Sequence, residues 1–342
     1  MKAAIRTGFT GFTYTFSNDH PLPTWDAGGK NAEDAYLRVN AGGMNPVDYK
    51  APRYVLGPVY GIDCCGIIER VGNGVGREWK VGDVVVGPAG GGSLADFTVA
   101  AASKIAKVPS GWTAEEAAAL PTAYNTAMTS FDAAGIMGAY QSSSKKTAPI
   151  DSILVIGSSG GCGLAALHLA KGMGIPRIVG ICSSRNVDFC KQNGATEVVT
   201  YDDDTSVETF YKDNEGKFDM IYDTASYSGG GESYSDDPKV KNLLKAKVTD
   251  PVEKPSYVVL NGSTFHWLRK LILGNPTSDP RMKLILTEHS REYLTLVLEL
   301  MDKAKFKPVI DSTFQFTDEG VQEGYKKLKS RRVKGKLIVK MK

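Results

Sequence analysis

Hydrophobic and polar residues in the first part of the chain follow the pattern of short β-strands. Residues 35–40 alternate, residues 81–86 follow a turn, and residues 66–72 form another strand pattern between two glycines. A helical period begins only at residue 113, where Thr113 and Glu116 have the spacing of a capping box. The pattern therefore predicts a β-rich domain over residues 1–126.

Beyond this region, apolar strand patterns alternate with helical ones. Residues 153–156 are a continuous apolar run, as expected for a strand covered on both faces of a parallel sheet. The elements expected after it are helices at 163–173 and around 187–191, and strands at 177–182, 197–200, 218–223 and 256–260. This α/β series predicts a Rossmann domain with a doubly wound parallel sheet over residues 127–288. A helix from residue 290 and a closing strand at 335–339 are expected to return to the β-rich domain, which then comprises residues 1–126 and 289–342.

Length, charge and cysteine content narrow the class of protein. A chain of 342 residues exceeds what one hydrophobic core usually organises, in agreement with two domains. The formal net charge is only +3, and the basic residues are scattered apart from residues 331–334, so nucleic acid is not an expected partner. No apolar run reaches the ~20 residues of a membrane span, and no signal-peptide pattern is visible. Five scattered cysteines favour a reducing compartment. We expect a cytoplasmic protein, or an organellar one if a transit peptide has been removed.

A glycine-rich loop lies between the apolar run at 153–156 and the helix that follows it. Its sequence is Gly157-Ser158-Ser159-Gly160-Gly161-Cys162-Gly163, a variant of G-x-G-x-x-G in which Ser158 stands for the first glycine. Glycines in such a loop permit a tight turn and let the backbone approach a pyrophosphate at the helix N-terminus. Between a buried strand and a helix the motif is a strong signal for a dinucleotide. We expect residues 158–163 to bind the cofactor phosphates.

The residues after the next strand decide between NAD and NADP. An NAD site has Asp or Glu about 20 residues after the loop, where it accepts hydrogen bonds from the ribose hydroxyls. This chain instead has Ser183, Ser184 and Arg185, and no acid before Asp188. Two hydroxyls and a guanidinium suit a 2′-phosphate. The sequence therefore predicts NADPH as the cofactor.

Two further segments are expected to contact the cofactor. Tyr201 follows the third strand of the series and could cover the adenine. Leu260, Asn261 and Gly262 lie at the carboxyl end of a sheet strand, the edge at which ligands bind in doubly wound sheets. We expect them to contact the nicotinamide carboxamide.

Several motifs along the chain occur together in one known family. They are residues 39–50, 61–66, 80–83, 117–121, 126–127, 157–163, 193–195 and 335–336. With them the chain resembles the zinc-free quinone oxidoreductase branch of the medium-chain dehydrogenases/reductases, which includes zeta-crystallin-like proteins and plastid enone reductases. The resemblance covers nearly the whole chain and implies a GroES-like catalytic domain for the β-rich part. It also implies a contact of Thr126 with the nicotinamide and, since many relatives are dimers, a possible homodimer.

The residues that zinc-dependent relatives use as ligands are absent. Those relatives have Cys at the position of Asn45 and Gly-His-Glu where this chain has Gly61-Ile62-Asp63. They also carry four closely spaced cysteines in a region that here, at residues 87–93, contains none. A catalytic zinc needs three protein ligands and a structural zinc needs four. We therefore expect no metal.

The resemblance implies an acceptor that takes hydride without a Lewis acid, a quinone or the β-carbon of an α,β-unsaturated carbonyl. By position, Asn45, Tyr49 and Lys50 are expected to line the acceptor site. Asn45 and Lys50 could donate hydrogen bonds to the acceptor oxygen, and Tyr49 could donate a proton or stack. Asn45 could instead only fix the turn before Pro46. An alternative function is an NADPH-binding redox sensor or structural protein with little catalytic activity, whereas the missing ligands disfavour a zinc alcohol dehydrogenase.

Overall fold

The computed structural model describes residues 1–8, 12–143, 150–246 and 255–341, which form two compact units. Unit 1 contains Met1–Asn125, His289–Leu298 and Lys307–Lys342, and unit 2 contains Thr126–Glu288 and Glu299–Phe306. The first boundary lies one residue before the expected one, and residues 299–306 fall in unit 2 instead of the β-rich part. In the described part of the chain, no helix is both long and apolar enough to cross a membrane.

Unit 1 is built on a seven-stranded sheet in which the long strand β3 (Asp34–Met44) pairs antiparallel with three others, β15, β4 and β6. The strand order is β14-β15-β3-β4-β5-β7. The alternation at residues 35–40 falls in β3, and the pattern at residues 66–72 falls largely in β4. The other strands are β1 (Ala3–Arg6), β2 (Tyr14–Ser17), β4 (Asp63–Val71), β5 (Val84–Pro88), β6 (Phe97–Ala101), β7 (Ala106–Lys107), β14 (Ile310–Gln315) and β15 (Lys336–Lys340).

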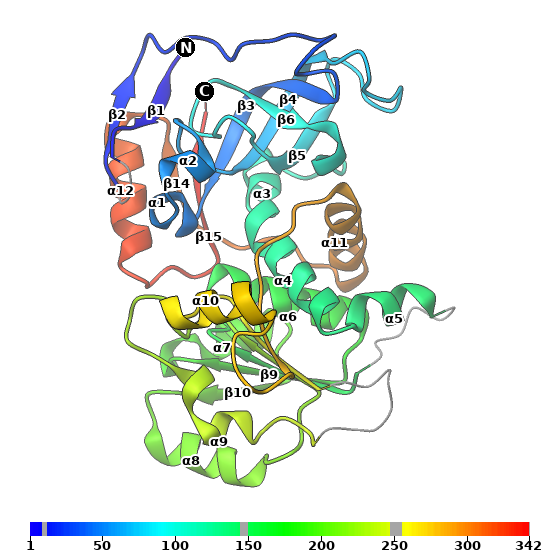
Figure 1. Cartoon of the computed structure of the whole chain (residues 1–342), viewed down its shortest axis with the longest axis vertical. Helices are drawn as coiled ribbons and strands as arrows, with labels where there is room; N and C mark the ends of the chain where they lie inside the picture. The colour runs from blue at the N-terminus through cyan, green and yellow to red at the C-terminus, as the bar shows by residue number, and fades with distance from the viewer. Residues whose placement is uncertain (9–11, 144–149, 247–254, 342) are drawn as a thin grey trace. The chain divides into compact units, whose positions relative to one another are not determined.

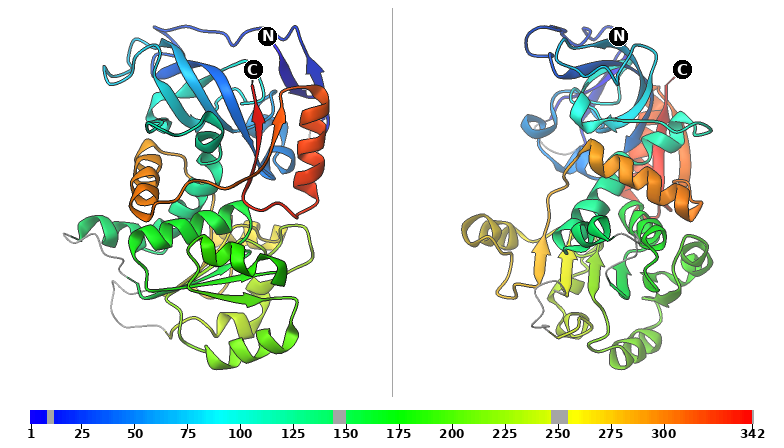
Figure 2. Two further views of the ribbon diagram at one scale, coloured as in Figure 1. Left: turned by 180° about the vertical axis from the view of Figure 1, so that it is seen from behind. Right: turned by 90° about the vertical axis from the view of Figure 1, so that its right-hand side faces the viewer.

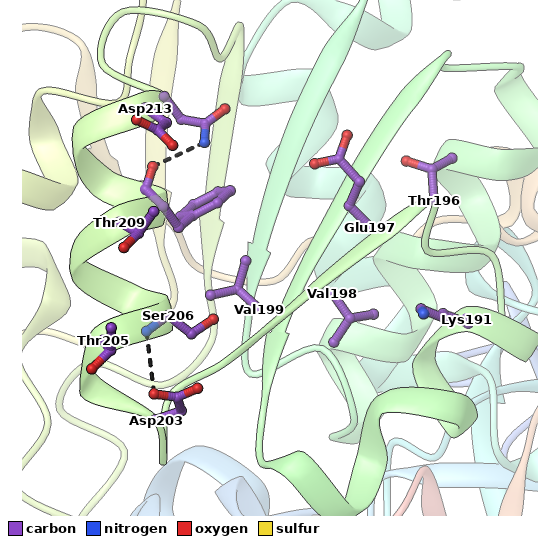
Figure 3. Close-up of a pocket in the computed structure, with 12 residues that line it drawn as sticks. Lys191, Thr196, Glu197, Val198, Val199, Asp203, Thr205, Ser206, Thr209 and Asp213 are labelled. Atoms are coloured by element: carbon purple, nitrogen blue, oxygen red, sulfur yellow. Dashed lines mark hydrogen bonds between the residues drawn. The ribbon is translucent and has the colours of Figure 1, made fainter.

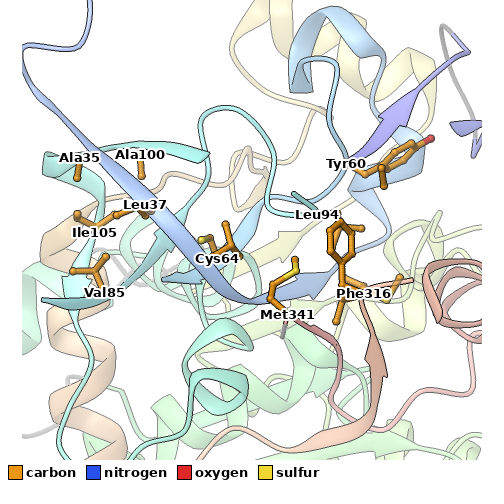
Figure 4. Close-up of a cluster of buried hydrophobic side chains, with 14 of the residues drawn as sticks. Ala35, Leu37, Tyr60, Cys64, Val85, Leu94, Ala100, Ile105, Phe316 and Met341 are labelled. Carbon is orange, nitrogen blue, oxygen red and sulfur yellow. The ribbon is translucent and has the colours of Figure 1, made fainter. Parts of the chain in front are cut away.

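Short helices and an apolar core complete unit 1. Thr113 caps α3 (Ala114–Ala118) through the expected capping box with Glu116. The core gathers buried side chains such as Leu37, Val85 and Leu94 (Figure 4), each of which contributes about 1.5–3 kcal/mol by burial. The remaining helices are α1 (Val47–Lys50), α2 (Arg53–Leu56), a 3-10 turn (Ala102–Lys104) and α12 (Asp318–Lys329). Because α1 follows directly on β3, the segment from Asn45 to Lys50 is held at the end of the central strand.

Unit 2 contains the doubly wound sheet that the sequence predicts. Its six strands are all parallel, in the order β10-β9-β8-β11-β12-β13, and helices cover both faces (Figures 1 and 2). The strands are β8 (Ser152–Ile156), β9 (Arg177–Cys182), β10 (Glu197–Thr200), β11 (Met220–Asp223), β12 (Ser256–Val259) and β13 (Met282–Leu284). The strand order reverses between β8 and β11, and ligands of doubly wound folds bind at such a switch point.

The helices of unit 2 connect these strands. They are α5 (Ile136–Ser142), α6 (Gly161–Met173), a 3-10 turn (Ser184–Asn186), α7 (Val187–Gln192), α8 (Asp204–Asp213), a second 3-10 turn (Tyr234–Asp236), α9 (Pro238–Lys241) and α10 (Thr264–Leu273). Two more, α4 (Pro121–Ala133) and α11 (Arg291–Ala304), have residues in both units. The continuous apolar run predicted as a strand is β8, whose five residues are all buried.

Candidate cofactor and acceptor sites

The glycine-rich loop connects β8 to α6 at the switch point of the sheet. Gly157 has a φ of +79°, in the left-handed region that favours glycine. A Cβ on Gly163 would lie 2.2 Å from the Gly157 carbonyl oxygen, so this glycine allows α6 to pack closely on the loop. A Cβ on Gly160 would meet only the Gly157 carbonyl oxygen, at 3.5 Å. Gly160 therefore leaves an open cradle beside the backbone.

The first turn of α6 presents its backbone N–H groups next to this cradle. Gly160 is the N-cap residue and, as a glycine, it provides no side-chain cap for the helix. A helix N-terminus carries partial positive charge, and its uncapped N–H groups bind phosphate well. The loop thus has the shape and the polarity that the pyrophosphate of a dinucleotide needs.

Ser158 lies beneath the loop, not in the cradle. Its side chain is fully buried, and both its backbone N–H and its hydroxyl donate to the Ile181 carbonyl oxygen, each at 3.1 Å. Its Oγ also lies 3.3 Å from the Cys190 Sγ. A Cβ on Gly180 would come within 2.7 Å of this Oγ. Ser158 is therefore engaged with β9 and its surroundings, and a direct phosphate contact by this residue stays a prediction.

Asn186 ties the glycine loop to the segment after β9, although sequence analysis did not single it out. Its amide nitrogen donates to Ser159 Oγ and to Ser183 Oγ, each at 3.1 Å. The side chain is buried, and its carbonyl oxygen has no hydrogen-bond partner among the described residues. An unpaired buried acceptor is costly unless a ligand or water satisfies it. The fold thus brings together two of the predicted cofactor segments. It also adds a hydrogen-bond acceptor, the Asn186 carbonyl oxygen, between them.

Ser184 and Arg185 are exposed at the corner where a 2′-phosphate was predicted. The Asp202 carboxylate occupies the donors of Ser184, accepting from its N–H at 2.9 and 3.1 Å and from its hydroxyl at 2.9 Å. These hydrogen bonds lower the pKa of Asp202, and the Arg185 charge lowers it further. This acid was not predicted from the sequence, because such an acid was expected only in the segment after β9. The run Asp202-Asp203-Asp204 after the neighbouring strand was the available signal.

The other predicted cofactor residues lie at the carboxyl ends of strands or at the start of unit 2. Tyr201 follows β10, and its side chain is half-exposed. Leu260, Asn261 and Gly262 follow β12 and are partly exposed. Thr126 is buried, and its hydroxyl lies 2.7 Å from that of Thr287.

In unit 1, three strand ends place a buried polar cluster around Asn45. Asn45 follows β3, Asp63 begins β4 and Lys336 begins β15. The Lys336 ammonium donates to Asp63 Oδ2 at 3.0 Å, to Asn45 Oδ1 at 2.5 Å and to the Met44 carbonyl oxygen at 3.3 Å. Asn45 Nδ2 donates to Asp63 Oδ2 at 2.9 Å. The amide of Asn45 is therefore bonded within the protein at both of its ends.

The second oxygen of Asp63 is also satisfied, because the backbone N–H and the hydroxyl of Thr122 donate to Oδ1 at 2.7 and 2.5 Å. The side chains of Asp63 and Lys336 are 0% and 6% exposed, so the ion pair is shielded from water. A buried ion pair of this kind is stable only while every partner is present, because removing one partner leaves an uncompensated buried charge. The cluster joins residues 45, 63, 122 and 336, of which sequence analysis placed only Asn45 in a site.

Asp48 forms a second buried group beside the cluster. Its Oδ2 accepts from the Asn45 N–H at 2.7 Å and from the Tyr325 hydroxyl at 3.0 Å. The guanidinium of Arg6 donates to the Asp48 backbone carbonyl oxygen. Burial raises the pKa of the Asp48 carboxyl to about 7, although the Asn45 N–H opposes this shift. Asp48 therefore titrates close to neutral pH inside the fold.

Tyr49 and Lys50 are more accessible than Asn45. The Tyr49 ring is partly buried, packs edge-on against Tyr325 with centroids 6.3 Å apart, and has the Lys329 ammonium 5.3 Å from its centroid. Burial raises the pKa of Tyr49. Lys50 is exposed, yet partial burial of its amine and the nearby Arg331 charge lower its pKa. Tyr49 and Lys50 each carry a hydrogen-bond donor, and Lys50 is the more exposed of the two.

The same cluster decides whether zinc fits. The positions that carry ligands in zinc-dependent relatives hold an amide (Asn45) and a hydrocarbon (Ile62), and the adjacent Asp63 is already paired with an ammonium 3.0 Å away. No group of three His, Cys, Asp or Glu side chains with metal-binding geometry occurs within the described ranges. Zinc is bound by Cys, His and carboxylate ligands. The donor set therefore does not fit a zinc ion.

Two surface grooves lie outside these sites. A groove of about 640 Å³ runs between α8 and β10, lined by Glu197, Asp203 and Asp213 among others (Figure 3). Another, of about 650 Å³, lies beside α12 and is lined by Tyr14 and Lys326 among others. Neither contains a predicted site residue.

Comparison with known proteins agrees with this architecture. The alcohol dehydrogenase GroES-like domain model matches residues 31–110, and the zinc-binding dehydrogenase model matches residues 193–339. The chain is 30% identical over 332 residues to the chloroplast envelope quinone oxidoreductase homolog of Arabidopsis thaliana, covering 93% of this chain and 92% of that protein. It is 28% identical over 324 residues to the 2-methylene-furan-3-one reductase of Solanum lycopersicum, covering 90% and 71%.

The fold is also similar to a solved structure. The quinone oxidoreductase from Thermus thermophilus, described together with its NADPH complex, superposes with a TM-score of 0.66 at 20% identity, covering 99% of this chain and 100% of that one. The chain belongs to the medium-chain dehydrogenase/reductase superfamily, in its zinc-free quinone oxidoreductase branch. It is thus an oxidoreductase of a family that uses a nicotinamide dinucleotide.

Proposed function

We propose that the protein is an NADPH-dependent, zinc-independent reductase that transfers hydride to a quinone or an α,β-unsaturated carbonyl. The open cradle at Gly160 before the uncapped start of α6 carries the proposal, because it leaves the backbone accessible to a pyrophosphate. The names of the two plant relatives support these acceptor classes, and the NADPH complex of the Thermus enzyme supports the cofactor.

Residues of unit 2 would bind and orient the cofactor, whose nicotinamide supplies the hydride when bound. The residues that we assign to the pyrophosphate share the glycine loop, and those assigned to the 2′-phosphate follow β9. The first set is Ser159, Gly160, Gly161, Cys162 and Gly163, and the second is Ser183, Ser184 and Arg185. Ser158, whose N–H and hydroxyl donate to Ile181, is assigned to hold the loop on β9. Tyr201 is assigned to the adenine, and Thr126 with Leu260, Asn261 and Gly262 to the nicotinamide.

On the acceptor side, Lys50 is assigned the role of donor to the acceptor oxygen. It would act as a charged hydrogen-bond donor, and its lowered pKa means that it loses this charge at a lower pH than a free lysine does. Tyr49 is assigned a stacking face. Asn45 is assigned to hold Asp63 and Lys336 in place, since both ends of its amide are bonded to them.

The test is oxidation of NADPH followed by absorbance with a panel of quinones, alkenals and enones. We expect turnover with at least one acceptor. Lys50→Met should lower kcat/KM by about 100-fold, the order found when a donor to a developing charge is removed. Lys50→Arg should retain most of the rate and hold it to higher pH than the wild type, because Lys50 deprotonates early while Arg stays charged.

Tight NADPH binding without turnover on any acceptor would instead favour the alternative, an NADPH-binding sensor or structural protein. Equal rates for the Met and Arg variants would remove Lys50 from the chemistry.

A small-molecule acceptor is the proposed partner. Cytoplasmic localisation and a homodimer stay predictions, to be checked by fractionation and by the molar mass in solution.

A further inference from the structure

The parallel order of the Rossmann sheet brings two separate segments to one corner. Thr200, the last residue of β10, is in register with Cys182, the last residue of β9. The segments 183–185 and 201–203 therefore leave the sheet side by side, and the Tyr201 N–H donates to the Cys182 carbonyl oxygen at 3.0 Å. This juxtaposition delivers Asp202 to the segment that sequence analysis assigned to the 2′-phosphate.

Asp202 uses the donors that a phosphate at this corner would need. The N–H and the hydroxyl of Ser184 both donate to its carboxylate, with distances of 2.9 to 3.1 Å. A 2′-phosphate would have to displace the carboxylate or bind next to a like charge. A ribose 2′-hydroxyl would encounter neither problem, since it can donate to an acceptor.

A second hydrogen-bond acceptor lies in the same corner. The Asn186 carbonyl oxygen is buried and has no hydrogen-bond partner within the described ranges, while the Asn186 amide nitrogen is held by Ser159 and Ser183. Hydroxyl groups, unlike a fully ionised phosphate, can satisfy such an acceptor. Arg185 has the opposite effect to these two hydrogen-bond acceptors, because it is an exposed cation that favours the phosphate.

We propose that Asp202 is a specificity-determining residue that lowers the preference of this site for NADPH over NADH. Its carboxylate accepts the hydrogen bonds that Ser184 could donate to a 2′-phosphate, and its negative charge repels that phosphate. The inference rests on the proposed function, since it presupposes that the glycine loop binds a dinucleotide. In doubly wound dinucleotide-binding folds, the acid that contacts the ribose lies about 20 residues after the glycine loop, next to the second strand. Here the acid comes from the end of the third strand.

The test compares dissociation constants of NADPH and NADH, measured by fluorescence titration at low salt, for the wild type and four variants. Asp202→Asn removes the charge and retains an acceptor for Ser184, and Asp202→Ala removes both. We expect each to tighten NADPH by about tenfold and to leave NADH nearly unchanged or weaker. The gain should shrink with added salt, because Asp202 is exposed and its charge is screened.

Asp204→Asn is the matched control. It removes an exposed acid two residues away that makes no hydrogen bond to Ser184, and it should leave the NADPH-to-NADH ratio of dissociation constants within about twofold of the wild type. Arg185→Glu should shift this ratio in the opposite direction from Asp202→Asn. Thermal unfolding of all variants checks that the fold is retained.

The outcomes separate the two proposals. A ratio for Asp202→Asn equal to that of Asp204→Asn, with both dinucleotides still bound, overturns the role of Asp202 and leaves the proposed function standing. Wild-type protein that binds neither dinucleotide overturns the proposed function itself. An unchanged ratio in Arg185→Glu contradicts the phosphate assignment at this corner.

Discussion

The glycine loop of unit 2 and the buried cluster of unit 1 are built in opposite ways. The loop is one continuous segment. Its proposed binding of phosphate depends on backbone groups and on glycines, which have no side chain, as at Gly160 and Gly163. The cluster joins Asn45, Asp63 and Lys336, which are up to 291 positions apart in the chain. It depends on charged and polar side chains that hydrogen-bond to one another while almost fully buried.

The difference shows where local sequence is informative. A strand, a glycine loop and a helix follow one another along the chain, so their spacing alone predicts a phosphate-binding backbone. The cluster exists only because β3, β4 and β15 pair in one register, with Gly43 opposite Asp63 and Met44 opposite Leu337. We therefore expect a mutation in the cluster to disturb unit 1 strongly, and one in the loop to affect ligand binding first.

Breaking the buried ion pair should give the largest effect. Lys336→Met leaves the Asp63 carboxylate buried without its ammonium partner, and we expect the free energy of unfolding to fall by about 3–5 kcal/mol. The measurement is denaturant unfolding at neutral pH. Lys340→Met is the matched control, since Lys340 pairs with Glu115 at the surface with half of its own side chain exposed, and its loss should cost at most about 1 kcal/mol. Equal losses in the two variants would mean that the cluster contributes no more than a surface pair.

Adding one methyl group to the loop should give an intermediate effect. The Cβ of Gly163→Ala would come 2.2 Å from the Gly157 carbonyl oxygen, so α6 or the loop must move. We expect a loss of about 1–3 kcal/mol in unfolding free energy, together with weaker NADPH binding. Gly138→Ala is the control, because a Cβ there meets no atom within 4 Å and alanine favours α5 by about 0.5–1 kcal/mol. Unaltered NADPH binding in Gly163→Ala would show that the loop tolerates the shift.

A third prediction concerns the pH dependence of stability. The pKa of Asp48 is raised from 3.8 to about 7 in the folded protein, so between these values the folded state holds a proton that the unfolded state has released. Stability from this group is therefore fully present below about pH 4 and is lost as the pH rises towards 7. Asp48→Asn should flatten this part of the profile, since the amide does not ionise and can still accept from Asn45 and Tyr325.

Denaturant unfolding at several pH values between about 4 and 8 measures the slope. Asp132→Asn, which removes an exposed acid on α4, is the control and should run parallel to the wild type. A profile for Asp48→Asn as steep as that of the wild type would assign the pH dependence to other groups.

Much of the fold could be predicted from pattern alone. The alternation at residues 35–40, the apolar run at 153–156 and the capping box at Thr113 all correspond to elements of the structure. Each is a local signal, because a strand buried on two faces or a capped helix imposes its requirement on neighbouring residues. Prediction was weaker for Ser158, which the motif assigns to the phosphate but which the structure places under the loop with its hydroxyl on Ile181. A motif gives the backbone position, whereas the side-chain direction depends on what packs beneath it.

Residue order and residue type were enough to predict the dinucleotide loop, the alternation of strands and helices after residue 150, and the lack of zinc ligands at Asn45 and Ile62. Folding was needed to bring Lys336 to Asp63 and Asn45, and Asp202 to Ser184. Both of these arrangements depend on which strands lie side by side, and strand order is a property of the whole sheet. For this reason the cofactor class can be predicted from one segment, whereas the balance between NADPH and NADH, as we propose it, depends on two segments that meet only after folding.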